Sequence, residues 1–249
     1  MPKNTQILLT ILSFIILCSC TTIQAHSNIS NPPTKSFVKI FHRIDIYSCV
    51  DEKDKNCPIG SRLSSGSGMA IKIIHGIPTV ITAGHVCDVG PTDKIKSFNQ
   101  TVEVLDYQSN IHQAYPILIS HNNQKGAPDA CLLFVPTLKL KLITISIVEP
   151  KVGDDLYYIG APLGIYHPPN PLIFRGVFSG GINPSTAQIT APAMGGASGS
   201  AVFNMKNEIV GVIWGTNVHF NNASVMTSYT SFKKFIEDGR KKLIIFSKK

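Results

Sequence analysis

The stretch Gly195-Gly196-Ala197-Ser198-Gly199-Ser200 is a small, turn-forming run that passes directly into the apolar residues Ala201-Val202-Phe203. It places Ser198 in a sharply bent segment at the start of a strand. Acyl transfer by a serine needs a hydroxyl that stands free and two N–H groups that point at the developing oxyanion. We expect these to be the N–H groups of Ser198 and Gly196, since glycine tolerates backbone angles that other residues resist. The competing interpretation is an ordinary glycine-serine turn.

A histidine follows a second apolar segment. Thr82-Ala83-Gly84-His85-Val86-Cys87 closes the strand expected over residues 77–81, so His85 stands at a strand end, where a general base can be presented. The chain has eight histidines, and the other seven lie in polar or proline-rich surroundings. The competing interpretation for His85 is an ordinary hydrogen-bonded histidine.

An aspartate opens a third apolar segment, Pro128-Asp129-Ala130-Cys131-Leu132-Leu133-Phe134-Val135. A buried carboxylate is costly unless it is paired, and an imidazole N–H is a natural partner. The alternative for Asp129 is a residue that ends a turn. Asp106 fits that alternative better, because polar turn residues follow it.

Together these stretches place His85, Asp129 and Ser198 in chain order, and here the sequence resembles the trypsin-like (chymotrypsin-fold) serine proteases, especially secreted bacterial and phage members. Thr-Ala-Gly-His, Asp-Ala-x-Leu-Leu and Gly-x-Ser-Gly are similar to that family's motifs and occur in its order. Two further stretches carry the resemblance, Ser65-Gly66-Ser67-Gly68-Met69-Ala70 upstream and residues 209–215 downstream, and the match spans roughly residues 60–237. Subtilisins and α/β-hydrolases have a different triad order.

The resemblance implies an all-β fold of two six-stranded antiparallel β-barrels, with the active site in the cleft between them and a short C-terminal helix. His85 and Asp129 would lie on the first barrel, over residues 61–145, and Ser198 on the second, which with the helix covers 146–239. Ser198 would attack a peptide carbonyl while His85 takes its proton and Asp129 orients His85. Ile213, Trp214 and Gly215 would pair with the substrate as an added strand. No cofactor is required.

The sequence departs from the digestive members of that family at two positions. Ala197 stands where they have an aspartate that pairs with a newly cut N-terminus, so we expect activity without cleavage of a pro-peptide, apart from signal removal. Pro192 stands where the family has the floor of its specificity pocket, so a preference for Lys or Arg is not supported. Ala191, Ala193 and Met194 indicate an apolar or small pocket, and His219 is an alternative lining residue that would favour acidic side chains.

Composition fits this fold. The chain has 249 residues, of which 43% are hydrophobic and 15% charged, as expected for one β-rich domain. The formal net charge is +8, and several lysines gather in a basic tail over residues 240–249. No motif that reads nucleic acid accompanies them. We expect a monomer whose partner is a protein or peptide substrate, with no specific nucleic acid and no metal.

Residues 1–25 are predicted to be a signal peptide, since an apolar run at residues 7–17 follows Lys3. An alternative is a lipoprotein signal over residues 1–19, in which case Cys20 would carry a lipid anchor. Either way the protein is exported: secreted, periplasmic or held at a membrane by lipid. Residues 26–60 form an N-terminal extension and the first strand.

Four cysteines remain for disulfides in the exported chain. Cys49 and Cys57 flank a polar loop and are the best candidate pair. Cys87 and Cys131 each lie two residues after a proposed triad member, so they would be close in space if the triad forms. Two buried free thiols are the alternative for this second pair.

The expected elements follow apolar periodicity and turn residues. Strands are expected at residues 38–47, 69–74, 77–81, 101–107, 115–120, 132–135, 156–159, 173–179, 187–190, 201–203 and 209–214. Residues 61–67 are expected to form a Ser/Gly turn. A helix is expected over residues 230–238, capped by Ser231 and ended by Gly239. The rival to an enzyme is a protease-fold binding protein with weak or conditionally switched activity, because an intact triad can be misaligned.

Overall fold

Short apolar and β-branched runs separated by turn residues produce twelve strands in the part of the chain that the structure describes. The structure is a computed structural model, and it describes residues 28–51, 55–74, 76–88, 94–121, 126–217 and 220–246. The chain divides into two units, Met1–Ser30 and Asn31–Lys249, and these strands all belong to the second. The predicted signal segment with Cys20, and also His219, lie outside the described residues.

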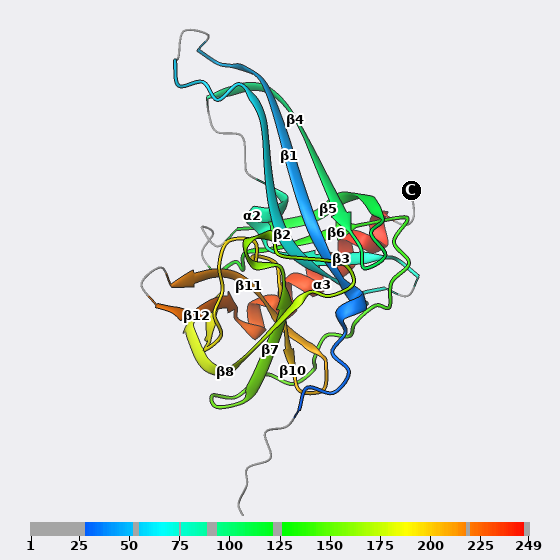
Figure 1. The fold of residues 1–249 in the computed structure, drawn as a ribbon, viewed down its shortest axis with the longest axis vertical. Helices are drawn as coiled ribbons and strands as arrows, with labels where there is room; N and C mark the ends of the chain where they lie inside the picture. The colour runs from blue at the N-terminus through cyan, green and yellow to red at the C-terminus, as the bar shows by residue number, and fades with distance from the viewer. Residues whose placement is uncertain are drawn as a thin grey trace, which may run out of the picture. The chain divides into compact units, whose positions relative to one another are not determined.

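The first six strands form a closed antiparallel barrel in the order β1-β2-β3-β6-β5-β4 (Figure 1). Their bounds are β1 Phe37–Cys49, β2 Gly60–Ile71, β3 Thr79–Thr82, β4 Ile95–Leu105, β5 Ile111–Ser120 and β6 Ala130–Phe134. Pairing of β1 with β4 closes the sheet on itself. The barrel therefore includes β1, which the sequence analysis grouped with the N-terminal extension.

The second six strands form another closed barrel with the same topology. Their bounds are β7 Asp155–Gly160, β8 Leu172–Asn183, β9 Thr186–Ile189, β10 Ala201–Asn204, β11 Ile209–Asn217 and β12 Phe220–Thr227. Starting from β7, the strand order is β7-β8-β9-β12-β11-β10, which repeats the order of the first barrel. The predicted pair of six-stranded barrels is thus confirmed.

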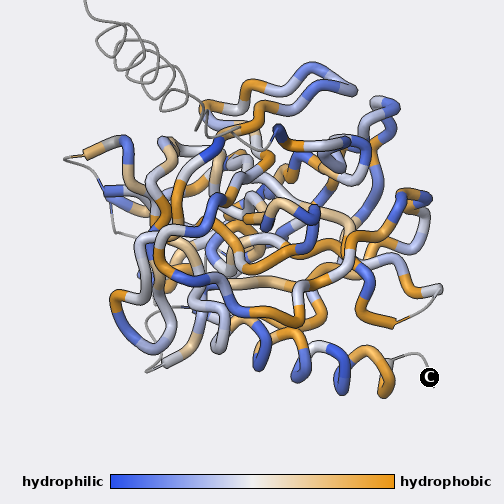
Figure 2. Tube along the Cα trace, turned by 90° about the horizontal axis from the view of Figure 1, so that it is seen from below, coloured by the Kyte–Doolittle hydropathy of each residue, from blue (hydrophilic) through white to orange (hydrophobic). Residues whose placement is uncertain are grey.

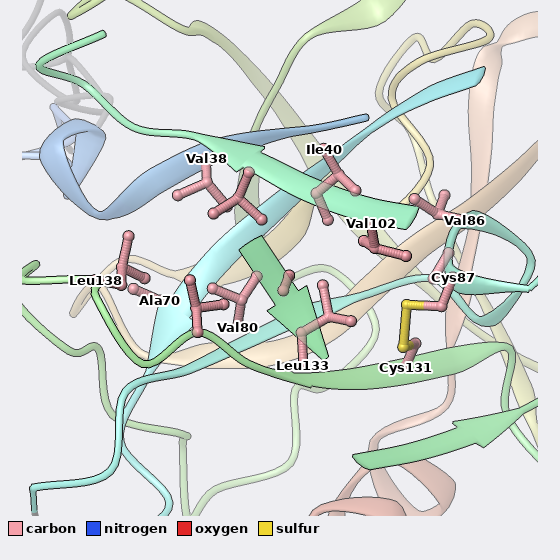
Figure 3. Packing of buried hydrophobic residues seen from close by; sticks show 14 residues of the cluster. Val38, Ile40, Ala70, Val80, Val86, Cys87, Val102, Cys131, Leu133 and Leu138 are labelled. Carbon is pink, nitrogen blue, oxygen red and sulfur yellow. A yellow bond between two sulfur atoms is a disulfide. The ribbon is translucent and has the colours of Figure 1, made fainter. Parts of the chain in front are cut away.

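Each barrel has its own apolar core. In the first, side chains from all its strands meet inside the sheet, and the disulfide between Cys87 and Cys131 lies at one end of this cluster (Figure 3). Val38, Val80 and Leu133 are fully buried there, and each such side chain contributes about 1.5–3 kcal/mol by its transfer from water. The second core is built around residues such as Tyr158 and Val202, which are also fully buried.

Three strands of the first barrel continue beyond it as a projecting sheet (Figure 1). Strand β2 pairs with β1 from Gly60 to Met69 but with β3 only over Met69–Ile71. Strand β4 pairs with β5 only over Val102–Leu105. We call residues 41–49, 60–66 and 95–101 the arm. The disulfide between Cys49 and Cys57 spans the connection of β1 to β2 at its tip.

Two expectations about strands were wrong. Residues 61–67 are not a turn but part of β2, because β1 supplies a ladder partner for this Ser/Gly-rich segment along its whole length. Strand β12 has no counterpart among the expected segments, because its polar Asn-Asn-Ala-Ser sequence lacks an apolar run. It forms because β11 and β9 pair with it on both sides.

The C-terminal helix α3 spans Tyr229–Phe246, so it begins and ends at different residues from those expected. The Ser228 hydroxyl accepts the N–H of Ser231 at 3.3 Å, which makes Ser228 rather than Ser231 the cap. Gly239 does not end the helix. A Cβ at Gly239 would lie 2.8 Å from Leu132 Cδ2, so glycine permits close packing on β6.

Apolar and polar residues alternate along α3 (Figure 2), and its buried Leu243 lies in the segment expected to be a basic tail. Within the described residues, no helix combines the length and the apolar character that crossing a bilayer requires.

Candidate active site

His85 lies on a single helical turn, α2, which spans Gly84–Cys87 and follows β3. A Cβ at Gly84 would lie 2.0 Å from the Ser120 carbonyl oxygen and 3.2 Å from the Ala130 nitrogen. Only glycine therefore allows α2 to pack directly on the ends of β5 and β6. This packing places His85 beside Asp129, the residue before β6.

The His85 and Asp129 side chains form a hydrogen-bonded pair. His85 Nδ1 lies 3.1 Å from Asp129 Oδ1, and the His85 backbone N–H donates to the same oxygen at 3.2 Å. The Asp129 side chain is 10% exposed and the His85 side chain 44%. A carboxylate at Nδ1 favours the tautomer with its proton on Nδ1, which leaves Nε2 free to accept one.

A disulfide reinforces this pair. Cys87 and Cys131 are bonded, with Cα atoms 6.4 Å apart, and each lies two residues beyond a member of the pair. The bond joins α2 to β6 at the end of the first core (Figure 3). Free thiols, the alternative weighed for these cysteines, are therefore not present.

A second Asp–His pair lies in the first barrel, at the turn between β4 and β5. Asp106 Oδ1 accepts the N–H groups of Gln108 and Asn110, and Asp106 Oδ2 lies 3.0 Å from His112 Nε2. Burial raises the pKa of Asp106, but these hydrogen bonds outweigh burial and hold the pKa below its usual value. Thr137 Oγ1 lies 2.8 Å from His112 Nδ1. Asp106 thus organises a turn, as its sequence context predicts.

Ser198 lies where the second barrel meets the residues that lead into α2. Its carbonyl accepts the Ser67 N–H at 2.8 Å. A Cβ at Gly199 would lie 2.0 Å from the Ser67 oxygen and 3.1 Å from the Ala83 nitrogen, so the Ser198–Gly199 peptide packs directly on β2 and on the start of α2. The Ser198 side chain is half-buried, and its hydroxyl has no hydrogen-bond partner among the described residues.

Hydrogen bonds to the carbonyl oxygens of Gly195 and Gly196 fix the two peptide groups that precede Ala197 and Ser198. The Gly195 carbonyl accepts the Leu163 N–H at 2.6 Å, and the Gly196 carbonyl accepts the Ser67 hydroxyl at 2.8 Å. Because C=O and N–H of a trans peptide point in opposite directions, the Gly196 N–H faces away from Leu163. Within the described ranges, the N–H groups of Gly196 and Ser198 make no hydrogen bond. Two such unpaired donors beside a serine suit an oxyanion.

Gly196 has backbone angles that require glycine. Its φ is +91°, in the region that L side chains rarely adopt, and a Cβ there would lie 2.6 Å from the Ala161 oxygen. The neighbouring loop η2, Pro162–Gly164, therefore contacts the Gly196 backbone directly. This contact fixes the position of the loop that carries the unpaired N–H groups of Gly196 and Ser198.

Ser67 is a site residue that sequence reasoning missed. It is fully buried, and its hydroxyl donates to the Gly196 carbonyl while accepting the Ala161 N–H at 2.9 Å. The hydroxyl thus bridges two segments of the second barrel from a strand of the first. The only sequence signal was the Gly66-Ser67-Gly68 run, which did not reveal where the side chain points.

The segment predicted to bind the substrate backbone lies in β11. The Ile213 N–H donates to the Ser200 carbonyl and the Ile213 carbonyl accepts the Gly199 N–H, so Ile213 ties β11 to the serine loop. The β11–β12 register shifts between Ile213 and Gly215, a bulge at Trp214. Trp214 packs against the core of the first barrel.

The residues predicted to line a specificity pocket are apolar. Ala193 is 3% exposed, and Pro192 is exposed. The Tyr158 hydroxyl donates to the Pro192 carbonyl, and burial raises the pKa of Tyr158, which keeps it a donor. The Ser224 hydroxyl donates to the Ala191 carbonyl. These two bonds fix the backbone on which the pocket would be built.

Comparison with known proteins identifies the family and the fold. Residues 66–212 match the family model described as a trypsin-like peptidase domain. The fold is similar to the active form of the Rv3671c protease from M. tuberculosis, with a TM-score of 0.60 and 17% identity over 82% of this chain and 81% of that one. No curated protein sequence matches the chain significantly.

The fold is also similar to the serine endoprotease from Yersinia pestis, with a TM-score of 0.62 and 17% identity. That match covers 86% of this chain but 65% of the Yersinia protein. At this identity the structures show the shared fold, whereas the family model covers more than half of the sequence. The chain belongs to the trypsin-like peptidase family, and it is a trypsin-like serine protease.

Proposed function

We propose that the protein is an exported serine endopeptidase that cleaves peptide bonds through an acyl-enzyme on Ser198. The observation that carries this proposal is the pair of unpaired N–H groups at Gly196 and Ser198, on a loop packed against the segment that bears the hydrogen-bonded His85–Asp129 pair. In this proposal the nucleophile, the base and the oxyanion donors lie where the two barrels meet.

In this mechanism the Ser198 oxygen attacks the substrate carbonyl carbon, and its proton passes to His85 Nε2. Asp129 holds the Nδ1 side of the ring and stabilises the imidazolium. The carbonyl oxygen becomes an oxyanion that accepts from the Gly196 and Ser198 N–H groups. When the tetrahedral intermediate collapses, the C–N bond breaks and His85 gives its proton to the leaving amine. Water then attacks the acyl-enzyme with His85 as the base, which releases the acid.

The loop that carries the N–H groups of Gly196 and Ser198 is held in place without an ion pair. Ala197 is buried, and its N–H donates to the Met194 carbonyl at 2.9 Å. The Ser67 hydroxyl and the Leu163 N–H hold the two neighbouring carbonyl groups. These contacts require no newly cut N-terminus, so we propose activity without cleavage of a pro-peptide, apart from removal of the signal.

The proposed substrate is an extended polypeptide. The backbone groups of Trp214 and Gly215 would pair with the residues before the scissile bond. The Ile213 carbonyl would accept a hydrogen bond from the same substrate segment through its second lone pair. The uncharged surroundings of Ala193 and the half-exposed Met194 favour a small or apolar side chain at the residue whose carbonyl is attacked. No cofactor takes part in this scheme.

Export is the second part of the proposal. The two disulfides are typical of proteins that fold in an oxidising compartment. We propose that residues 1–25 direct export, with a lipid anchor at Cys20 as the alternative form of the mature protein. In either form the enzyme would act as a monomer on a protein or peptide.

The test is labelling of the purified mature protein with a fluorophosphonate probe, with the modified residue mapped by mass spectrometry. We expect labelling at Ser198 that is lost in Ser198→Ala and strongly reduced in His85→Ala. Ser200→Ala is the matched control, because Ser200 lies on the same loop and its buried hydroxyl has no hydrogen-bond partner in the described structure. Absence of labelling in the folded wild-type protein would overturn the proposal and favour a protease-fold binding protein.

A further inference from the structure

Lys39 reaches from β1 of the first barrel to the loop η2 of the second. Its ammonium donates to the Gly164 carbonyl at 2.8 Å, and its Nζ lies 5.1 Å from the centre of the Phe41 ring. Lys39 is partly buried, and within the described residues it forms no ion pair. A hydrogen bond from a charged donor is stronger than one between neutral groups. The Lys39 ammonium is thus an anchor for one carbonyl group of the other barrel.

Lys39 and Ser67 hold opposite ends of η2. The two residues lie directly opposite each other on β1 and β2, so their side chains lie on the same side of the sheet. The Ser67 hydroxyl accepts the N–H of Ala161, the residue before η2. The Lys39 ammonium binds the carbonyl of Gly164, the last residue of η2. One cross-strand pair of the first barrel therefore attaches both ends of the loop.

The backbone of η2 has a conformation that side-chain packing does not secure. Leu163 has a φ of +54°, which is uncommon for a residue other than glycine. Its side chain is 65% exposed. Gly164 follows with a φ of +72°. Because the Leu163 side chain contributes little packing, the loop depends on hydrogen bonds to its main-chain groups, and the bond from Lys39 is one of them.

The same loop orients the peptide group that carries one proposed oxyanion donor. The Leu163 N–H donates to the Gly195 carbonyl at 2.6 Å. That carbonyl and the Gly196 N–H belong to one planar peptide group, so the bond that fixes one also fixes the other. A Cβ at Gly196 would lie 3.0 Å from the Gly164 nitrogen, so η2 cannot shift without moving the Gly196 backbone. A chain of contacts therefore runs from Lys39 through η2 to the Gly196 N–H.

We propose that Lys39 is a positioning residue for the reaction at Ser198, and that its ammonium holds η2 in the conformation that directs the Gly196 N–H at the oxyanion. This inference rests on the proposed function, because Gly196 acts as a donor only in acyl transfer. Lys39 acts through the loop and not on the reacting atoms. Since the oxyanion forms only in the transition state, a displaced donor lowers kcat and leaves substrate binding unchanged.

The first experiment compares Lys39→Met and Lys39→Arg with the wild type on one peptide, chosen from the cleavage products of an unfolded protein. Methionine is also long and unbranched but has no donor, so we expect kcat to fall by about 10-fold or more while KM changes by less than about twofold. Arginine can donate the same single hydrogen bond, so Lys39→Arg should keep most of the kcat. Lys35→Met is the matched control. The Lys35 Nζ also lies near an aromatic ring, 5.8 Å from the centre of Tyr107, and its removal should leave both constants unchanged.

A second experiment measures the loop without catalysis. The N–H groups of Ala161, Leu163, Gly164 and Ile165 are all hydrogen-bonded, so hydrogen exchange over residues 161–165 shows whether η2 keeps its place. In the Ser198→Ala protein, Lys39→Met should speed this exchange by about 10-fold or more, because the loop opens locally. Lys39→Arg and Lys35→Met should leave it unchanged.

Unchanged exchange over residues 161–165 in Lys39→Met would overturn the proposal. An unchanged kcat, or a rise in KM that accounts for the whole loss of kcat/KM, would also overturn it. In each of these cases the protease function stands, because the wild type cleaves the peptide. A wild-type protein that neither cleaves peptides nor reacts with a fluorophosphonate at Ser198 would instead refute the proposed function, while exchange still decides whether Lys39 holds η2.

Discussion

The hydroxyl of Ser67 donates a 2.8 Å hydrogen bond to the carbonyl of Gly196, from a strand of the first barrel to the serine loop of the second. The same oxygen accepts the Ala161 N–H. One buried side chain thus orients the Gly196–Ala197 peptide, which lies between the proposed oxyanion donor at Gly196 and the proposed nucleophile Ser198. This contact links the assembly of the two barrels to the geometry of the proposed active site.

We predict that Ser67→Ala lowers kcat by about 10- to 100-fold with little change in KM, because the Gly196 peptide loses its anchor and an oxyanion donor moves. Stability should also fall by about 1–3 kcal/mol, since the buried Ala161 N–H loses its partner. Steady-state kinetics and urea unfolding measure the two effects. Thr79→Val is the control: the Thr79 hydroxyl is also buried and donates to the Ile71 carbonyl within the first barrel. It should lose similar stability but keep kcat, and an equal fall of kcat in both variants would contradict a positioning role.

We predict that Asp129→Asn and Asp106→Asn have opposite phenotypes although each aspartate contacts a histidine. Asp129→Asn should reduce kcat by a factor on the order of 10³–10⁴ while the fold remains intact, because an amide at this position no longer favours the productive tautomer of His85. Asp106→Asn should leave kcat unchanged and lower stability. Peptide hydrolysis and urea unfolding, run on both proteins at one temperature, test the pair. A large loss of kcat in Asp106→Asn would contradict the assignment.

The contribution of Asp106 to the stability of the fold should depend on pH. The pKa of Asp106 lies below its usual value in the folded protein, so its contribution to stability is present above the unfolded pKa of about 3.9. It should disappear as the pH falls below that value and the carboxylate is protonated. The stability curves of wild type and Asp106→Asn should therefore converge in acid.

We predict that the two disulfides differ in importance. Chain-entropy arguments give about 4 kcal/mol for the bond between Cys87 and Cys131 and about 2.5 kcal/mol for the bond between Cys49 and Cys57, because the first closes a longer loop. The first bond also joins the elements that bear His85 and Asp129, whereas the second lies at the arm tip. Replacing Cys87 and Cys131 by alanine should therefore lower both Tm and kcat. The matched Cys49 and Cys57 double variant should lower Tm less and keep kcat for short peptides.

We predict that a buried histidine makes the protein less stable at mildly acid pH. His42 is 1% exposed, and neither ring nitrogen has a hydrogen-bond partner within the described residues. Burial lowers the pKa of His42, and the nearby Gln100 and Asp88 only partly oppose this effect. Below the unfolded pKa of about 6.5, the unfolded chain therefore binds a proton that the folded protein excludes, and the free energy of unfolding falls.

His42→Leu tests this explanation, because leucine removes the titrating group and leaves no buried polar atom. Stability measured by urea unfolding should fall less between pH 7.5 and pH 5.5 in the variant than in the wild type. The slopes of the free energy of unfolding against pH should differ between the two proteins by at most about 1.4 kcal/mol per pH unit. Parallel pH profiles for the two proteins would show that His42 is not the responsible group.

The sequence by itself determined the local chemistry of this protein. Apolar runs ended by His85 and begun by Asp129, with the small residues around Ser198, carried the resemblance to the trypsin-like serine proteases, and that resemblance implied two antiparallel barrels with a site between them. These signals are local, because a strand end and a glycine turn depend on neighbouring residues. The positions of Cys87 and Cys131, each two residues after His85 or Asp129, allowed either a disulfide or two buried free thiols.

Only the tertiary structure decided the features that depend on contacts between one segment and another. Gly239 has the local context of a helix end, yet close packing on Leu132 makes it an interior residue of α3. Strand β12 is polar and forms because partners lie on both sides of it. The arm exists because β1 pairs with a Ser/Gly-rich segment, and Ser67 reaches Gly196 because two barrels meet there. Pairing and packing between separate segments leave no periodic pattern in the sequence, so they appear only once the chain is folded.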